Sequence, residues 1–369
     1  MPEATAPVDY GRLTVAHYSA HPGQSPSPAA VHDGALDAAA VIPAAELPVY
    51  VISDVHVDFQ ENLAWVEDTL VDHGPNSVVV VAGDCTDDLA LLRRCLIAFR
   101  AKFGTVFYVV GNHELWIRCP GVEPADSFSK FDVIVALCRE LGVLTEPAWV
   151  ADYRCLIVPL PSWYDGTLHQ YAPWESPGPH VDHALECWND TKWCNWGIGI
   201  GRATSAELLG RVVSRFHEYA EHNLAVAQEL VARRSELCAP GSAPIVVVSF
   251  SHFYSNRQQL MPLMEAARTI QPSASGRYPP NFTSVAGTTR LQTFIDRLDP
   301  SVHVCGHSHR PFDFVVASAG SDDDASSPAV GHERARKHGC RYVHFPLGYP
   351  GERERGLAPV AQPSPLRLF

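Results

Sequence analysis

The chain alternates short runs of branched apolar residues with longer segments of mixed apolar and charged residues. The runs have the length and composition of strands buried on both faces. Two of the runs cover residues 49–52 and 302–305, and three others begin near residues 77, 105 and 244. The longer segments predict helices over 61–71, 89–103, 128–141 and 206–237, with Asp87 or Asp88 capping the second. Strands that alternate with helices predict βαβ crossovers and a mainly parallel sheet, an α/β fold.

The remaining segments divide the chain. Residues 1–45 are rich in Ala, Pro, Ser and Gly, and we expect a disordered leader before a catalytic body over 46–350. Short strands are expected near 142–145 and 154–160, with a further strand beginning at 340 after a long hairpin loop over 317–339. Residues 161–201, rich in Trp, Pro, His and Gly, predict an irregular insertion that shapes the pocket, and 351–369 a loose tail.

Composition limits the class of protein. The 369 residues are 46% apolar, which is enough for one large core or two modest ones. No apolar run approaches the roughly 20 residues that span a bilayer, and the N-terminus lacks the pattern of a secretory signal. The ten cysteines contain no CxxC pair, which favours reduced thiols. We therefore expect a cytoplasmic protein without a membrane partner.

The charge argues against a polyanionic partner. The net charge is −13, and no Lys/Arg block offsets it. Such a surface repels duplex nucleic acid, so a phosphorylated small molecule or a phosphoprotein fits better as substrate. Neither charge nor composition predicts an oligomeric state.

Polar residues follow each of the five apolar runs. In an extended segment His307 and His309 would point to the same side, so both rings would face one spot and suit a metal ion. For this pair alone, a polar strand end with two exposed histidines is the alternative. Ligands gather at the carboxyl ends of strands in α/β sheets. Oxygen and imidazole donors without thiolate suit Mn, Fe, Zn or Co. The five groups are Asp54-Val55-His56, Gly83-Asp84, Gly111-Asn112-His113-Glu114, Ser251-His252 and Gly306-His307-Ser308-His309.

The ordered blocks DVH, GDCTD, GNHE, SH and GHSH resemble those of the calcineurin-like metallophosphoesterases, from about residue 49 to 350. The resemblance implies a four-layer αββα sandwich in which two mixed sheets pack face to face, with the metal site at the carboxyl ends of the strands. It implies two divalent or mixed-valence metal ions and His113 as catalytic residue. The implied ligands are Asp54, His56 and His309 for one ion, Asn112, His252 and His307 for the other, and Asp84 bridging both.

The implied chemistry is consistent with these residue types. Two metals about 3.5–4 Å apart can clamp an in-line displacement at phosphorus and make hydroxide available near neutral pH. The charge of two divalent ions exceeds that of two carboxylates and one hydroxide, so the site would attract a phosphate ester. His113 would stabilise or protonate the leaving oxygen. Asp87 occupies the position of a tyrosine that binds ferric iron in one branch of the family, so a coloured iron site is not expected.

Further residues are weaker candidates. Arg118 is a candidate for bidentate contact with substrate phosphate, with a surface arginine as the alternative. Trp163 and Tyr164 are candidates for substrate contact, with packing as the alternative. Glu114 is expected to orient its neighbours through hydrogen bonds rather than to bind metal.

The sequence thus predicts a dinuclear metallophosphoesterase that hydrolyses phosphomonoesters or phosphodiesters with a metal-bridging hydroxide. One alternative is a nuclease or cyclic-nucleotide phosphodiesterase on the same fold. Another is a non-catalytic scaffold, which the presence of all seven candidate ligands disfavours.

Overall fold

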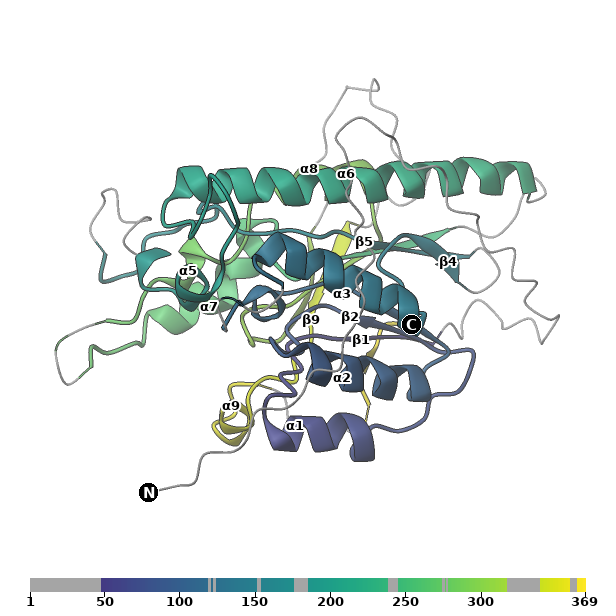
Figure 1. Cartoon of the computed structure of the whole chain (residues 1–369), viewed down its shortest axis with the longest axis horizontal. Helices are drawn as coiled ribbons and strands as arrows, with labels where there is room; N and C mark the ends of the chain where they lie inside the picture. Colours follow the sequence, from purple (N-terminus) through teal and green to yellow (C-terminus); the bar gives the residue numbers. More distant parts are fainter. Residues whose placement is uncertain are drawn as a thin grey trace. The chain divides into compact units, whose positions relative to one another are not determined.

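The fold is described from a computed structural model of the chain (Figure 1). The residues that the structure describes belong to one compact unit. The expected leader and almost all of the expected loop over 317–339 lie outside the described residues. Those described are 48–118, 121, 124–150, 154–175, 185–237, 245–273, 276, 278–316, 339–358 and 364–369.

The first sheet has four strands in the order β10-β1-β2-β3. Strands β1, β2 and β3 are parallel and level: Ile52 pairs with Val81, and Val81 pairs with Tyr108. Because they end level, the residues that follow them emerge at one edge of the sheet. The short β10 runs antiparallel to β1. The strands are β1 (Val49–Ile52), β2 (Val78–Val81), β3 (Thr105–Tyr108) and β10 (Leu366–Arg367).

The second sheet has six strands in the order β4-β5-β6-β7-β9-β8. Its four inner strands are parallel, and its two edge strands, β4 and β8, are antiparallel to their neighbours. Both sheets are therefore mixed, as predicted. The strands are β4 (Ala148–Val150), β5 (Cys155–Pro159), β6 (Val246–Phe250), β7 (Val302–Cys305), β8 (Phe312–Val316) and β9 (Cys340–His344).

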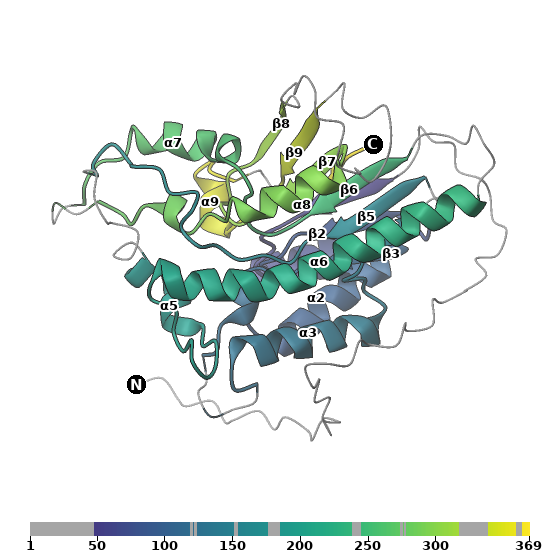
Figure 2. The same cartoon turned by 90° about the horizontal axis from the view of Figure 1, so that it is seen from above.

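Helices cover the outer faces of the two sheets (Figure 2). No described helix is long and apolar enough to cross a membrane. The longest, α6, has the bounds expected from the sequence. The helices are α1 (Gln60–Ala64), which a π-helical turn (Trp65–Thr69) continues, α2 (Leu89–Lys102), α3 (Ser127–Leu141), α5 (Asn189–Trp193), α6 (Ala206–Leu237), α7 (Met261–Ala267), α8 (Arg290–Leu298) and α9 (Pro350–Glu354).

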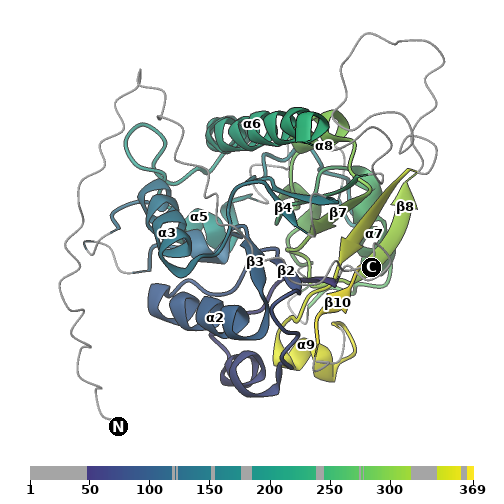
Figure 3. The ribbon, with the colours of Figure 1, turned by 90° about the vertical axis from the view of Figure 1, so that its right-hand side faces the viewer.

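Successive side chains of a strand point to opposite faces of its sheet, and this explains the four layers. Val78 and Val80 of β2 pack against the second sheet, in a core that includes Val248 and Phe250 of β6. Val79 and Val81 face the other way, into a core with α2 and α3. The second sheet in turn packs its outer face against α6 and α8. The end-on view in Figure 3 shows α2 and α3 on one side and α6 and α8 on the other. The αββα prediction is confirmed.

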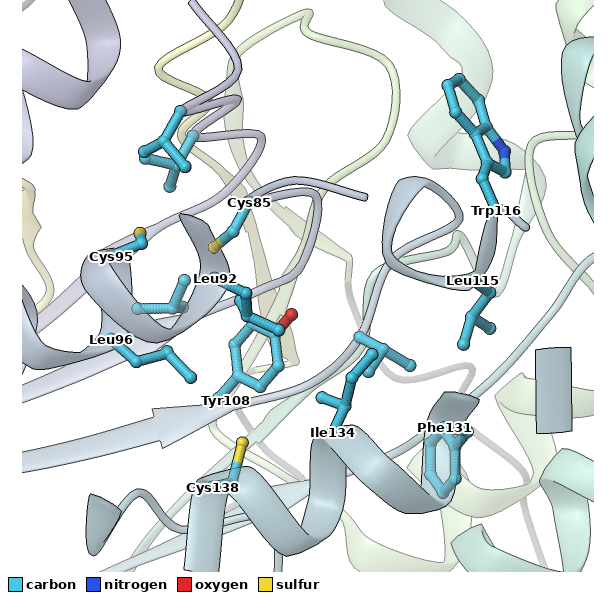
Figure 4. Packing of buried hydrophobic residues seen from close by; sticks show 14 of the residues in the cluster. Cys85, Leu92, Cys95, Leu96, Tyr108, Leu115, Trp116, Phe131, Ile134 and Cys138 are labelled. Atoms are coloured by element: carbon cyan, nitrogen blue, oxygen red, sulfur yellow. The ribbon is translucent and has the colours of Figure 1, made fainter. Parts of the chain in front are cut away.

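The core between the first sheet and its helices is filled by side chains from β3, α2 and α3 (Figure 4). Tyr108 lies between Leu92 of α2 and Cys138 of α3. Asp88, one of the two expected caps, begins α2 by accepting hydrogen bonds from the backbone N–H groups of residues 90 and 91.

Two expected elements differ. The strand expected near 142–145 is an isolated bridge between Leu144 and Phe107, and β4 lies farther along the chain. The expected loose tail contains α9 and β10 instead. Leu368 is buried in the core between the sheets, and this apolar contact holds the C-terminal segment on the edge of β1. A strand of two residues carries too little periodic signal to be predicted.

The buried His303 of β7 makes folding stability sensitive to acid. Burial lowers its pKa to about 3, whereas an unfolded histidine titrates near 6.5. Below about pH 6.5 His303 is therefore protonated in the unfolded chain but stays neutral in the folded one. Folding stability is then lost as the pH falls toward the pKa of the folded state. We expect the unfolding free energy of wild type minus that of His303→Asn to shrink by about 2 kcal/mol between pH 6.5 and 5. Urea unfolding across that range checks this, and parallel pH curves for the two proteins would contradict it.

Candidate metal centre

Seven polar side chains meet where β1, β2, β3, β6 and β7 end. All seven are buried, with exposed fractions from 0% for Asp54 to 8% for His309. Each follows its strand directly or within a few residues, so the level ends of the strands explain why they converge. The seven are Asp54, His56, Asp84, Asn112, His252, His307 and His309.

The side chains form two groups that share one carboxylate. The ligand atoms of Asp54, His56, Asp84 and His309 all lie within 4.8 Å of one another. A second group of the same tightness contains Asp84, His252 and His307. Asp84 alone belongs to both, the position expected of a bridging ligand.

Asn112 joins the second group through its side-chain oxygen. This Oδ1 lies 3.2 Å from Nε2 of His252 and 3.0 Å from Nδ1 of His307. Nε2 of His252 in turn lies 3.4 Å from Oδ2 of Asp84. In the first group, Nε2 of His56 and Nε2 of His309 are 2.9 Å apart. Electron-pair donors therefore converge on two adjacent points.

Three of the histidines have their other ring nitrogen engaged. Nδ1 of His252 lies 2.8 Å from the carbonyl oxygen of Ala82, and Nε2 of His307 lies 3.0 Å from that of Val285. A carbonyl oxygen only accepts, so these nitrogens donate and the lone pair of the opposite nitrogen faces the site. His309 is held in the same way through Nδ1, 2.6 Å from the Glu352 carboxylate.

The backbone is strained at this site. Six non-glycine residues in the described part of the chain have positive φ, and all except Asp299 are candidate ligands. Such conformations cost free energy for residues with a Cβ and cluster at functional sites. The other five are Asp54, His56, Asp84, His307 and His309.

The extended conformation expected for His307 and His309 is therefore wrong. Their φ angles are 81° and 55°, because β7 ends at Cys305 and the chain turns there. The two rings belong to different groups and do not face one spot.

Two motif glycines permit close approach at the site. A Cβ on Gly111 would lie 2.1 Å from Oδ1 of Asp84, and one on Gly306 would lie 2.8 Å from Nδ1 of His252. No larger residue fits either position without displacing a candidate ligand. The glycines of GNHE and GHSH thus serve the geometry of the site.

Glu114 holds two of the ligand loops together, as expected. Its buried carboxylate accepts hydrogen bonds from the backbone N–H of Asp84 at 3.1 Å and of Gly111 at 2.7 Å. It lies outside both ligand groups. Its role is to fix the turn after β2 against the turn after β3.

The electrostatics of the site favour bound positive charge. Burial tends to raise the pKa of Asp84, but the adjacent His252 holds it well below its usual value. Burial alone would lower the pKa of His252, and the Asp84 carboxylate raises it to about 9. A cation bound at Nε2 would therefore displace a proton from that nitrogen. Asp54 likewise stays ionised despite burial, because His344 and His309 lower its pKa. Two ionised carboxylates among imidazole nitrogens are a donor set that fits divalent transition metals.

His113 belongs to neither of these two groups, but its ring nitrogen lies within 4.8 Å of ligand atoms of His56 and Asp58. Its backbone N–H donates to Oδ1 of Asp84 at 3.0 Å, and its Nε2 is 3.9 Å from Oδ2 of the same residue. The ring stacks on Trp116, with ring centres 3.8 Å apart. His113 is half-buried, so its ring is fixed and still reachable.

The three residues that are candidates for substrate contact differ in their exposure to solvent. The exposed Arg118 donates to Asp87 and lies over Trp116, its Cζ 4.9 Å from the ring centre. Trp163 and Tyr164 are each only 1% exposed. Burial leaves them no surface for a substrate, and this corrects the expectation of substrate contact. They are packing residues, the alternative given for them above.

The sequence reasoning missed several supporting residues. His344 places Nε2 at 3.0 Å from Oδ2 of Asp54, and it ends β9 just as other histidines follow their strands, a signal that was available. Glu352 lies in the segment expected to be loose, and Asp190 in the insertion expected to be irregular. Neither carboxylate stands in a motif.

Comparisons with known proteins agree with this geometry. Residues 47–311 match the family model of calcineurin-like phosphoesterases. The chain is 33% identical over 275 residues to PptH of Mycobacterium tuberculosis, an acyl-carrier-protein phosphodiesterase, covering 72% of this chain and 74% of that protein. The structure resembles the crystal structure of phosphopantetheinyl hydrolase (PptH) from the same organism, with a TM-score of 0.55 and 22% identity, over 84% of this chain and 93% of the other.

Proposed function

This chain belongs to the calcineurin-like phosphoesterase family, and from that premise we propose that it hydrolyses the phosphodiester that joins a phosphopantetheinyl group to an acyl carrier protein. Membership makes it a metal-dependent hydrolase of phosphate esters, which sets the non-catalytic alternative aside. The choice of ester is the further step. It rests on the 33% identity with a relative named for that activity.

We further propose the ligand sets. One divalent cation would be held by Asp54, His56 and His309, and the second by Asn112, His252 and His307, with Asp84 available to both. The sharing of Asp84 between two compact groups is the single observation that carries this assignment. Mn, Fe or Zn suits these nitrogen and oxygen donors. The catalytic domain expected from residue 46 onward would, on this proposal, also include β10, which completes its first sheet.

The protein's own residues supply the rest of the chemistry. Bound divalent cations would supply Lewis acidity and make hydroxide available near neutral pH. Hydrolysis adds the oxygen of water to phosphorus and breaks the bond to the leaving oxygen, which must gain a proton. We assign the donation of that proton to His113. Its reachable ring, with Nε2 3.9 Å from Oδ2 of Asp84 and stacked on Trp116, supports this role. The Asp84 carboxylate also orients His113 through the backbone N–H.

Nucleic acid fits less well as substrate. The net charge of −13 repels a long polyanion, whereas one ester on a carrier protein presents a single phosphate to a site that would hold two cations. A phosphomonoester on a small molecule or protein is the second candidate. The family performs both reactions on one fold, so the site chemistry alone does not separate them.

The test is a substrate panel assayed with added Mn²⁺. Holo acyl carrier protein should lose its phosphopantetheinyl group, detected as the mass of the apo protein, and bis-aryl phosphodiesters should react more slowly. A chelator should abolish the reaction, and apo carrier protein serves as the blank. Rapid turnover of an aryl phosphomonoester with no release from holo carrier protein would contradict the proposal and leave the family assignment intact.

A further inference from the structure

Asp190 connects the aromatic insertion to the candidate metal centre. It lies in α5 and is 2% exposed. Its carboxylate accepts three hydrogen bonds. Oδ1 accepts from Nδ2 of Asn112 at 2.9 Å and from Nε1 of Trp116 at 2.6 Å, and Oδ2 accepts from the hydroxyl of Tyr164 at 3.1 Å. A buried carboxylate with these partners is held in one orientation.

The contact decides which way the Asn112 amide faces. An ionised carboxylate only accepts hydrogen bonds, so the NH₂ end of Asn112 must point toward Asp190. The carbonyl Oδ1 then points the opposite way, toward Nε2 of His252 and Nδ1 of His307. Rotating the amide by half a turn would set oxygen against oxygen at Asp190 and point an NH₂ group, which cannot ligate, at the cation site.

We propose that Asp190 is a positioning residue that fixes Asn112 with its oxygen directed at the second metal ion. The inference rests on the proposed function in one respect, that Asn112 is a ligand. It gives the insertion a role in assembling the metal centre, beyond shaping a pocket. Mutating a residue that hydrogen-bonds to a metal ligand typically lowers metal affinity by about 10- to 100-fold.

The same carboxylate supports the catalytic histidine indirectly. Trp116 donates to Asp190, and its indole ring stacks on the His113 ring. Loss of Asp190 is therefore expected to lower kcat as well as metal affinity. A residue that served only folding would change neither quantity in a folded variant.

The test compares Asp190→Ala, Asp190→Asn and the control Asp165→Asn. Asp165 is also a buried carboxylate of the insertion, 5% exposed, and its hydrogen bonds go to Thr167 and Thr288 rather than to a candidate ligand. Metal-free protein is titrated with Co²⁺, with absorbance and metal content as readouts. Thermal unfolding of the metal-free proteins reports on folding.

We expect wild type and Asp165→Asn to bind two ions with affinities within about twofold of each other. Asp190→Ala should bind one of the two ions about 10- to 100-fold more weakly. Asp190→Asn keeps the volume but can present its own NH₂ group to Asn112, so it should show a smaller loss, roughly fivefold.

Two unweakened sites in folded Asp190→Asn would overturn the inference. If Asp190→Ala does not fold, the Asn variant and its control carry the test alone. Failure of wild type itself to bind a pair of ions would instead refute the proposed ligand sets, so the two failures are distinguishable.

Discussion

Asp84→Asn is expected to lower kcat/KM by about 100-fold or more, because it weakens both metal sites in one substitution. The wild-type carboxylate belongs to both ligand groups, is 1% exposed, and is held ionised by His252. Asparagine is neutral, offers one oxygen, and would point an amide NH₂ into one of the two groups. Electrostatic attraction between the site and two divalent ions falls accordingly.

The measurement is kinetics with parallel metal analysis on dialysed protein. Bound metal should fall well below two ions per chain, and excess Mn²⁺ should recover part of the rate. Asp165→Asn again serves as the control for neutralising a buried carboxylate, and it should keep wild-type metal content. Full rate with both ions bound in the Asp84 variant would show that Asp84 does not bridge them.

His113→Ala is expected to lower kcat by about 100- to 10,000-fold while leaving the metal content unchanged. The ring lies beside Asp84 and against Trp116, but the seven-residue ligand set does not include it. If His113 protonates the leaving oxygen, the loss should be large for alkyl esters, whose leaving groups need a proton. It should be small for nitrophenyl esters, which depart as stable anions.

Comparing two leaving groups separates proton donation from general damage. A variant that had lost its fold or its metals would lose activity equally on both esters. Turnover equal to wild type on an alkyl ester would remove His113 from the mechanism.

The convergence of the candidate ligands could be predicted from the sequence, for a physical reason. β1, β2 and β3 are short runs of apolar residues that end level. Motifs that lie far apart in the sequence therefore emerge at the same edge of the first sheet. The apolar pattern, which predicts the strand ends, and the motifs, which supply the polar side chains, therefore indicate the same site. The bounds of α6 and the cap on α2 followed from local signals in the same way.

What the sequence did not predict depends on long-range packing. Asp190 and Glu352 contact the site from residues far away in the chain, and no periodicity or motif marks them. His344 differs, because its place at the end of β9 was a signal that the sequence offered. The extended reading of the segment after β7 failed because local spacing says nothing about a left-handed turn at His307. For Trp163 and Tyr164 the sequence left substrate contact and packing open, and the burial of both side chains favours packing.

The central claim, that residues from five strand ends hold two adjacent cations, is tested most directly by anomalous diffraction from crystals grown with Mn²⁺. We predict two anomalous peaks, one within roughly 2 Å of donor atoms of Asp54, His56 and His309 and the other equally close to Asn112, His252 and His307, with Asp84 touching both. A single peak, or a pair that Asp84 does not join, would contradict it.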